Sequence, residues 1–202
     1  MSSKTKIVVL GMISPEIAVY GIYHSGNWYS PWNKVLIQEH LLRFIRLSVI
    51  KQRYKKVAIM YAEHFFEPLG EGKVFDRYKN IIISPLGQFG SLLPHVVVEQ
   101  SFKEAIENSR SEVVFVLGGE DLWQEAMKEA DEIIITKVPQ EIRVIGEIYT
   151  FPQFLNVPLY SSLHRTGGLF HMEGEYILET NFYEKVPRLV KPHGYWWSQR
   201  GG

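Results

Sequence analysis

The 202-residue chain contains no cysteine, which excludes a disulfide framework and thiolate metal sites. It has no excess of either charge, because 22 Lys and Arg residues balance 22 Asp and Glu residues. A broadly basic surface for nucleic acid or anionic membranes is therefore excluded. The first apolar run, at residues 7–12, is interrupted by Ser-Pro-Glu at residues 14–16 and is too short to cross a bilayer. We expect a cytoplasmic protein that binds neither nucleic acid nor membrane.

The chain does contain enough apolar material for one large core. Apolar residues make up 46% of the sequence, which is typical of a globular domain without long disorder. We find no internal repeat or linker, so we expect a single domain over residues 1–202, with a core at residues 6–186 and an aromatic tail at residues 187–202. The seven histidines form no His-x-x-x-His pair, and no carboxylates stand at ligand spacing, so no metal site is predicted.

The segment from residue 113 to residue 138 is the most informative part of the sequence. An apolar run at residues 113–117 is typical of a strand buried on both faces. Gly118 and Gly119 end this run, and an amphipathic helical pattern begins at once. A β-branched run at residues 133–136 then returns to the sheet. The segment predicts a βαβ unit, and ligands of open α/β sheets bind at the carboxyl ends of such strands. A plain tight turn is the competing interpretation of the two glycines.

In the rest of the chain, strand-like and helix-like segments also alternate. This alternation predicts one mostly parallel α/β sheet of about eight strands, with helices on both faces. A long connection rich in Gly, Tyr, Ser, Pro and Trp is expected to form a functional loop at residues 14–32. Ser101 followed by Glu104 is a capping-box pattern at the start of a helix. The further expected elements are strands at residues 6–12, 56–60, 80–84 and 95–98, helices at 35–49 and 101–108, and a last antiparallel pair at about 159–164 and 174–186.

In their order and spacing, the expected elements and their motifs resemble the dihydrofolate reductase family over residues 6–186. The motifs that carry the resemblance are Pro-Trp at 31–32, Phe-Ile-Arg-Leu-Ser at 44–48, Val-Ala-Ile-Met at 57–60, Lys-Asn-Ile-Ile-Ile-Ser at 79–84, Glu-Ala-Ile at 104–106, Leu-Gly-Gly at 117–119, Ala-Asp-Glu-Ile-Ile-Ile-Thr at 130–136 and Thr-Phe-Pro at 150–152. The insert between Gly21 and Pro31 is similar to that of divergent, phage-encoded members. The resemblance implies a single-domain fold with an eight-stranded sheet and an antiparallel C-terminal strand. It also implies hydride transfer from NADPH to dihydrofolate, giving tetrahydrofolate for one-carbon metabolism.

The implied catalytic group is a carboxylate on the first helix, four residues before a phenylalanine that packs on the folate. Counted back from Phe44, that position is His40, and Glu39 lies beside it. Adjacent helix positions point about 100° apart, so only one of the two can face the pocket. We favour Glu39, because only a carboxylate accepts both hydrogens of the aminopyrimidine edge. Trp32 and Thr136, whose family counterpart bonds the catalytic carboxylate, complete the predicted catalytic set.

The implied cofactor site departs from the family pattern in its charge. The family's Met-Gly-Arg-x-Thr reads Met60-Tyr-Ala-Glu-His64 here, so that Ala62 replaces the arginine that grips the 2′-phosphate. Carboxylates in the first turn after the glycines repel a pyrophosphate at that helix end. We therefore expect weak NADPH binding with little preference over NADH, and the resemblance implies a cis peptide between the two glycines. The residues expected to bind the cofactor are Gly118, Gly119, Glu120, Trp123, Ala62, His64 and Ser84.

The implied substrate site combines Phe44 and Leu117 with a cationic clamp for the folate carboxylate. The family's arginine matches Tyr78, and Arg77 is one residue away. Ordinary core packing is the competing interpretation for Phe44 and Leu117. Two other functions stay open: a catalytically decayed reductase fold that acts as a binding or structural subunit, and a riboflavin-pathway reductase. The aromatic tail at residues 195–197 either folds over the core or contacts another chain.

Overall fold

The computed structural model describes residues 4–15, 19–24, 27–29, 32, 34–66, 75–87, 95–139, 146–153, 163–173 and 176–185. Their elements, in chain order, are β1 (Lys6–Ile13), β2 (Val19–His24), β3 (Asn27–Tyr29), α1 (Lys34–Gln52), β4 (Val57–Ala62), α2 (Glu63–Phe66), β5 (Lys79–Ile83), β6 (Val96–Glu99), α3 (Phe102–Ser109), β7 (Val113–Gly118), α4 (Glu120–Glu129), β8 (Glu132–Lys137), β9 (Glu147–Thr150), β10 (Leu163–Glu173) and β11 (Tyr176–Lys185).

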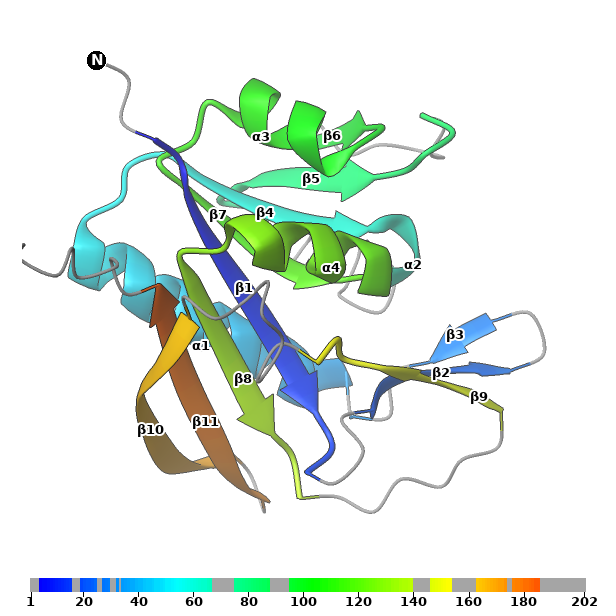
Figure 1. The fold of residues 1–202 in the computed structure, drawn as a ribbon, viewed down its shortest axis with the longest axis vertical. Helices are drawn as coiled ribbons and strands as arrows, with labels where there is room; N and C mark the ends of the chain where they lie inside the picture. Colours follow the sequence, from blue (N-terminus) through cyan, green and yellow to red (C-terminus); the bar gives the residue numbers. More distant parts are fainter. Residues whose placement is uncertain are drawn as a thin grey trace, which may run out of the picture.

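Eight of these strands form one twisted sheet in the order β10-β11-β8-β1-β7-β4-β5-β6 (Figure 1). The pairs from β8 across to β6 are parallel, whereas β11 runs antiparallel to β8 and β10 antiparallel to β11. Every residue of β7 is buried, as its unbroken apolar sequence predicts for a central parallel strand. The predicted α/β class, with a mostly parallel sheet and an antiparallel C-terminal strand, is confirmed.

Helices cover both faces of this sheet. In Figure 1, α4 lies in front of β1 and β7 and α1 lies behind the sheet. Helix α4 buries Leu122, Trp123, Ala126 and Met127, which its amphipathic pattern places on one side. At the start of α3, the Ser101 hydroxyl accepts a hydrogen bond from the Glu104 N–H at 3.3 Å, so the predicted capping interaction is present.

The expected loop at residues 14–32 was the largest error in predicting the fold. It contains β2 and β3, which join β9 in a separate antiparallel sheet of order β3-β2-β9 (Figure 1). The many Gly, Ser and Pro residues of this segment indicated a loop, but Val, Ile, Tyr and Trp between them favour strands. The first strand of the C-terminal pair was also misplaced, since β10 begins at Leu163, and residues 159–162 lie outside the described residues.

Candidate active site

Three buried polar side chains meet near the carboxyl end of β8. Thr136 lies opposite Met12 of β1 and opposite Thr180 of β11 in the sheet. The Thr136 Oγ1 atom is 2.7 Å from His40 Nε2 and 2.9 Å from Thr180 Oγ1. All three side chains are at most 1% exposed. Helix α1 thus carries a polar group to the sheet edge at which α/β proteins bind ligands.

The structure does not bring Glu39, the favoured candidate, to this site. Glu39 is exposed, whereas His40 is 1% exposed and bonded to Thr136. The buried stripe of α1 also contains Leu41, Phe44 and Ile45. Because positions four apart lie on one helix face, His40 shares its face with Phe44, and Glu39 cannot. An uncharged imidazole is also a cheaper group to bury than a lone carboxylate.

The predicted apolar residues Phe44, Trp32 and Leu117 are all buried, and Phe44 lies beside His40. The rings of His40 and Phe44 are 4.8 Å apart, and Phe44 in turn is 6.0 Å from Phe182 of β11. Trp32, just before α1, is buried, and so is Leu117 near the carboxyl end of β7. The imidazole is itself 1% exposed and has the Phe44 ring beside it, and in such an apolar environment its hydrogen bond to Thr136 is stronger than in water.

The two predicted clamp residues differ in their surroundings. Arg77 is exposed, whereas Tyr78 is half-buried and packs against the core. Which of them contacts a substrate carboxylate stays a prediction.

Gly118 and Gly119 are required by close packing on either side of the β7–α4 turn. A Cβ at Gly118 would lie 2.2 Å from the Phe65 ring. Gly119 has a φ of 108°, and a Cβ there would lie 2.5 Å from the Cβ of Ala62. No residue with a side chain fits this turn without displacing its neighbours. The prediction of a cis peptide between the glycines is wrong, since the described residues contain none, and the positive φ of Gly119 makes the turn instead.

Behind this turn, four aromatic side chains pack together. The Trp123 ring centroid lies 4.6 Å from Tyr20, 5.7 Å from Phe65 and 4.5 Å from Phe151. Burial raises the pKa of the Tyr20 hydroxyl, so that it stays protonated. The sequence predicted Trp123 and missed the other three. Phe151 lies within the Thr-Phe-Pro motif at residues 150–152, and Tyr20 lies in the segment that was expected to be a loop.

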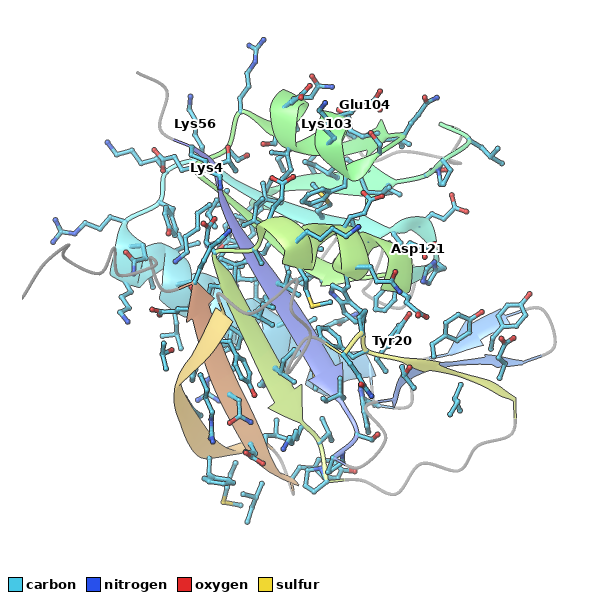
Figure 2. All side chains as sticks on the ribbon, viewed as in Figure 1. Lys4, Tyr20, Lys56, Lys103, Glu104 and Asp121 are labelled. Atoms are coloured by element: carbon cyan, nitrogen blue, oxygen red, sulfur yellow. The ribbon has the colours of Figure 1, made fainter. Side chains whose placement is uncertain are left out.

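A groove of about 660 Å³ opens where α4 begins. Figure 2 shows two residues at this end of the molecule, Asp121 on α4 and Tyr20 at the small sheet. The lining of this groove brings together four of the predicted cofactor residues, Ala62, His64, Gly119 and Glu120. Trp123 and Ser84 are buried and are not among the residues that line it.

The groove is predominantly acidic. Glu63, Glu120, Asp121 and Glu125 line it, and among its described lining residues only Lys128 is a lysine or arginine. Desolvation lowers the pKa of His64, although the carboxylates of Glu63 and Asp121 oppose this shift. His64 is therefore mostly neutral at pH 7 and adds little positive charge.

The part of the chain that the structure describes holds no group of three or more His, Asp or Glu side chains arranged to bind a metal ion. Among the same residues, no helix is long and apolar enough to span a membrane.

The dihydrofolate reductase family model matches residues 46–166, which is more than half of the chain. The chain belongs to the dihydrofolate reductase family. A solved structure, dihydrofolate reductase from Enterococcus faecalis complexed with NADP(H) and RAB-propyl, has the same fold. It matches with a TM-score of 0.65 and 14% identity over 91% of this chain and 98% of that chain. By sequence comparison, no curated protein matches the chain.

The family match confirms the resemblance and does not favour the decayed-subunit or riboflavin-pathway alternatives. Six of the eight motifs, from residue 57 to residue 152, lie inside the matched region. Glu39 and His40 lie before it. The assignment of the dihydrofolate reductase site on α1 therefore depends on the geometry around Thr136, and the similarity to phage-encoded members stays a prediction.

Proposed function

We propose that this protein is an NADPH-dependent dihydrofolate reductase, with His40 as the polar group of α1 that faces the pterin. The hydrogen bond of His40 to Thr136 carries the proposal. In the family, the counterpart of Thr136 bonds the catalytic carboxylate, and here the same threonine is buried against an imidazole at 2.7 Å. The fold and the family match make this the site at which the family's chemistry is expected.

Each remaining residue has a role that follows from its position. Phe44, whose ring lies 4.8 Å from that of His40, would pack against a flat pteridine, and Leu117 is the second apolar residue proposed to contact it. Thr136 orients His40 through their hydrogen bond, and Trp32, buried just before α1, stays in the proposed catalytic set. Arg77 or Tyr78 would contact the folate carboxylate. Dihydrofolate is a small molecule, so the proposed reaction requires no nucleic acid and no membrane.

The groove at Gly119 fits a dinucleotide in its position, although its acidic lining does not suit the phosphates. It lies at the carboxyl edge of the sheet, and Gly119 allows the start of α4 to pack closely against Ala62. Bound there, NADPH would supply the hydride. The chain would hold the cofactor through Ala62, His64, Gly119 and the first N–H groups of α4, with the Trp123 cluster packed beneath the turn.

The acidic lining predicts weak and poorly selective binding of NADPH. A charge-assisted contact to a phosphate contributes about 1.5–3 kcal/mol, or one to two decades of affinity. Ala62 offers no such contact, and Glu63 adds repulsion. Calorimetry should therefore give dissociation constants for NADPH and NADH within about tenfold of each other. Glu63→Gln should tighten NADPH more than NADH, with Glu107→Gln, away from the groove, as the control. Tight and strongly NADPH-selective binding by the unmodified protein would contradict this prediction.

The proposed function is tested by turnover of the unmodified protein. With dihydrofolate and NADPH, the loss of NADPH absorbance should follow saturable kinetics and depend on both substrates. Tetrahydrofolate, identified by mass spectrometry, should accumulate in equal amount. No turnover with either NADPH or NADH, in a protein that is folded by circular dichroism, would refute the proposal and leave a binding or structural role.

We further propose that residues 1–202 act as one domain in a reducing cytoplasm, to which a cysteine-free reductase is suited. The aromatic tail at residues 187–202 lies outside the described residues, and no observation supports its contact with another chain.

A further inference from the structure

His40 ends a chain of three hydrogen-bonding side chains that crosses from α1 to two strands. It runs from His40 Nε2 through Thr136 Oγ1 to Thr180 Oγ1, with distances of 2.7 Å and 2.9 Å. Thr136 and Thr180 face each other across the β8–β11 ladder, and Thr180 is fully buried. The sequence had not singled out Thr180.

The number of hydrogens in this chain limits its direction. Each threonine hydroxyl has one hydrogen to donate, and a neutral imidazole carries one hydrogen on either of its nitrogens. Within the residues that the structure describes, the Thr180 hydroxyl is hydrogen-bonded to Thr136 alone. If Thr136 donated to Thr180, the hydrogen of Thr180 would be left without an acceptor in the core, a defect that folded proteins rarely contain.

The opposite direction gives every hydroxyl hydrogen an acceptor. Thr180 donates to Thr136 Oγ1, and the Thr136 hydroxyl, having no other acceptor among the described residues, donates to His40 Nε2. A hydrogen on Nε2 would instead point at Thr136 and leave one of the two threonine hydrogens without an acceptor. The hydrogen of the imidazole therefore belongs on Nδ1.

We propose that Thr136, oriented by Thr180, holds His40 in the tautomer protonated at Nδ1, and that His40 thereby sets the ligand specificity of the site. In this tautomer the Nε2 lone pair accepts from Thr136 and Nδ1 carries a hydrogen, so neither nitrogen accepts a hydrogen bond from a ligand. A carboxylate at this place would accept two. The site therefore selects against 2,4-diaminopteridines, which bind to a carboxylate as cations, more strongly than against the neutral pterin of dihydrofolate, whose pyrimidine edge also offers donors. This specificity rests on the proposed function, whereas the tautomer does not.

The tautomer is tested on the full chain with ¹⁵N-labelled histidine. A two-bond ¹H–¹⁵N spectrum separates protonated from unprotonated ring nitrogens, and the His40→Asn variant identifies the His40 signals. Nδ1 should be protonated in the unmodified protein, in Thr136→Ser and in Thr180→Val, because all three keep a hydroxyl at position 136 that donates to Nε2. Thr136→Val, which removes that donor, should show protonated Nε2. A protonated Nε2 in the unmodified protein, or no change in Thr136→Val, would overturn the proposal.

The specificity is tested by titrating methotrexate, a 2,4-diaminopteridine, and following tryptophan fluorescence. His40→Asp should bind it about ten- to a hundredfold more tightly than the unmodified protein, because it restores a charged acceptor. His40→Asn, of the same shape without the charge, should gain much less. Equal affinity in all three proteins would overturn the specificity. Absence of methotrexate binding in all three, with the tautomer as expected, would instead refute the proposed function.

Discussion

The His40→Ala variant should lose about ten- to a hundredfold of kcat/KM for dihydrofolate, whereas Glu39→Gln should change it less than twofold. Removal of the imidazole leaves the buried Thr136 hydroxyl without its acceptor and opens a gap beside Phe44, whose ring lies 4.8 Å away. Glu39 follows one residue earlier on the same helix but is exposed, which makes it a matched control. Steady-state kinetics with varied dihydrofolate at saturating NADPH measure both variants.

The outcome distinguishes the two candidates for the polar group of α1. A large loss in Glu39→Gln with no loss in His40→Ala would return the role to the carboxylate. A loss confined to His40→Ala would have to be separated from misfolding, so the free energy of unfolding is measured for the same preparations. His40→Gln retains a polar side chain and should lose less than His40→Ala.

Replacing Gly119 with alanine should lower the free energy of unfolding by about 2–4 kcal/mol. A non-glycine residue at a positive φ costs of order 1–3 kcal/mol, and overpacking of a filled core typically costs a further 1–3 kcal/mol. Both costs apply here, because Gly119 has a φ of 108° and its new Cβ would lie 2.5 Å from that of Ala62. Urea unfolding followed by circular dichroism measures the change.

Two further variants divide this cost into its parts. Combining Gly119→Ala with Ala62→Gly removes the clash but not the backbone strain, so it should recover part of the loss. Gly167→Ala, where an added Cβ meets no atom within 4 Å, should change stability by less than about 0.5 kcal/mol. If Gly119→Ala were as stable as the unmodified protein, the turn would have an alternative conformation that admits a side chain.

The sequence predicted the central sheet well because its signals there are local. The apolar run before Gly118 and the helix after Gly119 each indicate their structure within a few residues, and they reappear as β7 and α4. In contrast, β2 is held by β9, which lies far along the chain, and no local pattern of residues 14–32 shows that pairing. Turn-forming residues therefore outweighed the strand-forming ones in the prediction.

The difference between the preferred Glu39 and the buried His40 has another cause, since the signal for burial was present in the sequence. His40, Leu41, Phe44 and Ile45 repeat at helical spacing and are all buried, while Glu39 and Arg43 are exposed. We favoured Glu39 for the chemistry expected of a carboxylate, and burial followed the periodicity instead. The link from Thr136 to Thr180 could not be predicted, because it depends on the register between β8 and β11.

The pairing of β2 with β9 also constrains how the chain folds. It joins residues 19–23 to residues 147–150. Of the strands in the large sheet, β1 precedes both segments in the chain, and β4 and β7 lie between them. The entropy lost on closing a loop rises with its length, so contacts this distant in sequence form slowly unless the intervening chain is already compact. Tyr20 and Tyr149, which line the groove, belong to these two strands. We therefore expect this wall of the groove to be completed after the large sheet that supports it, so that a partly folded chain would have a core but no finished groove.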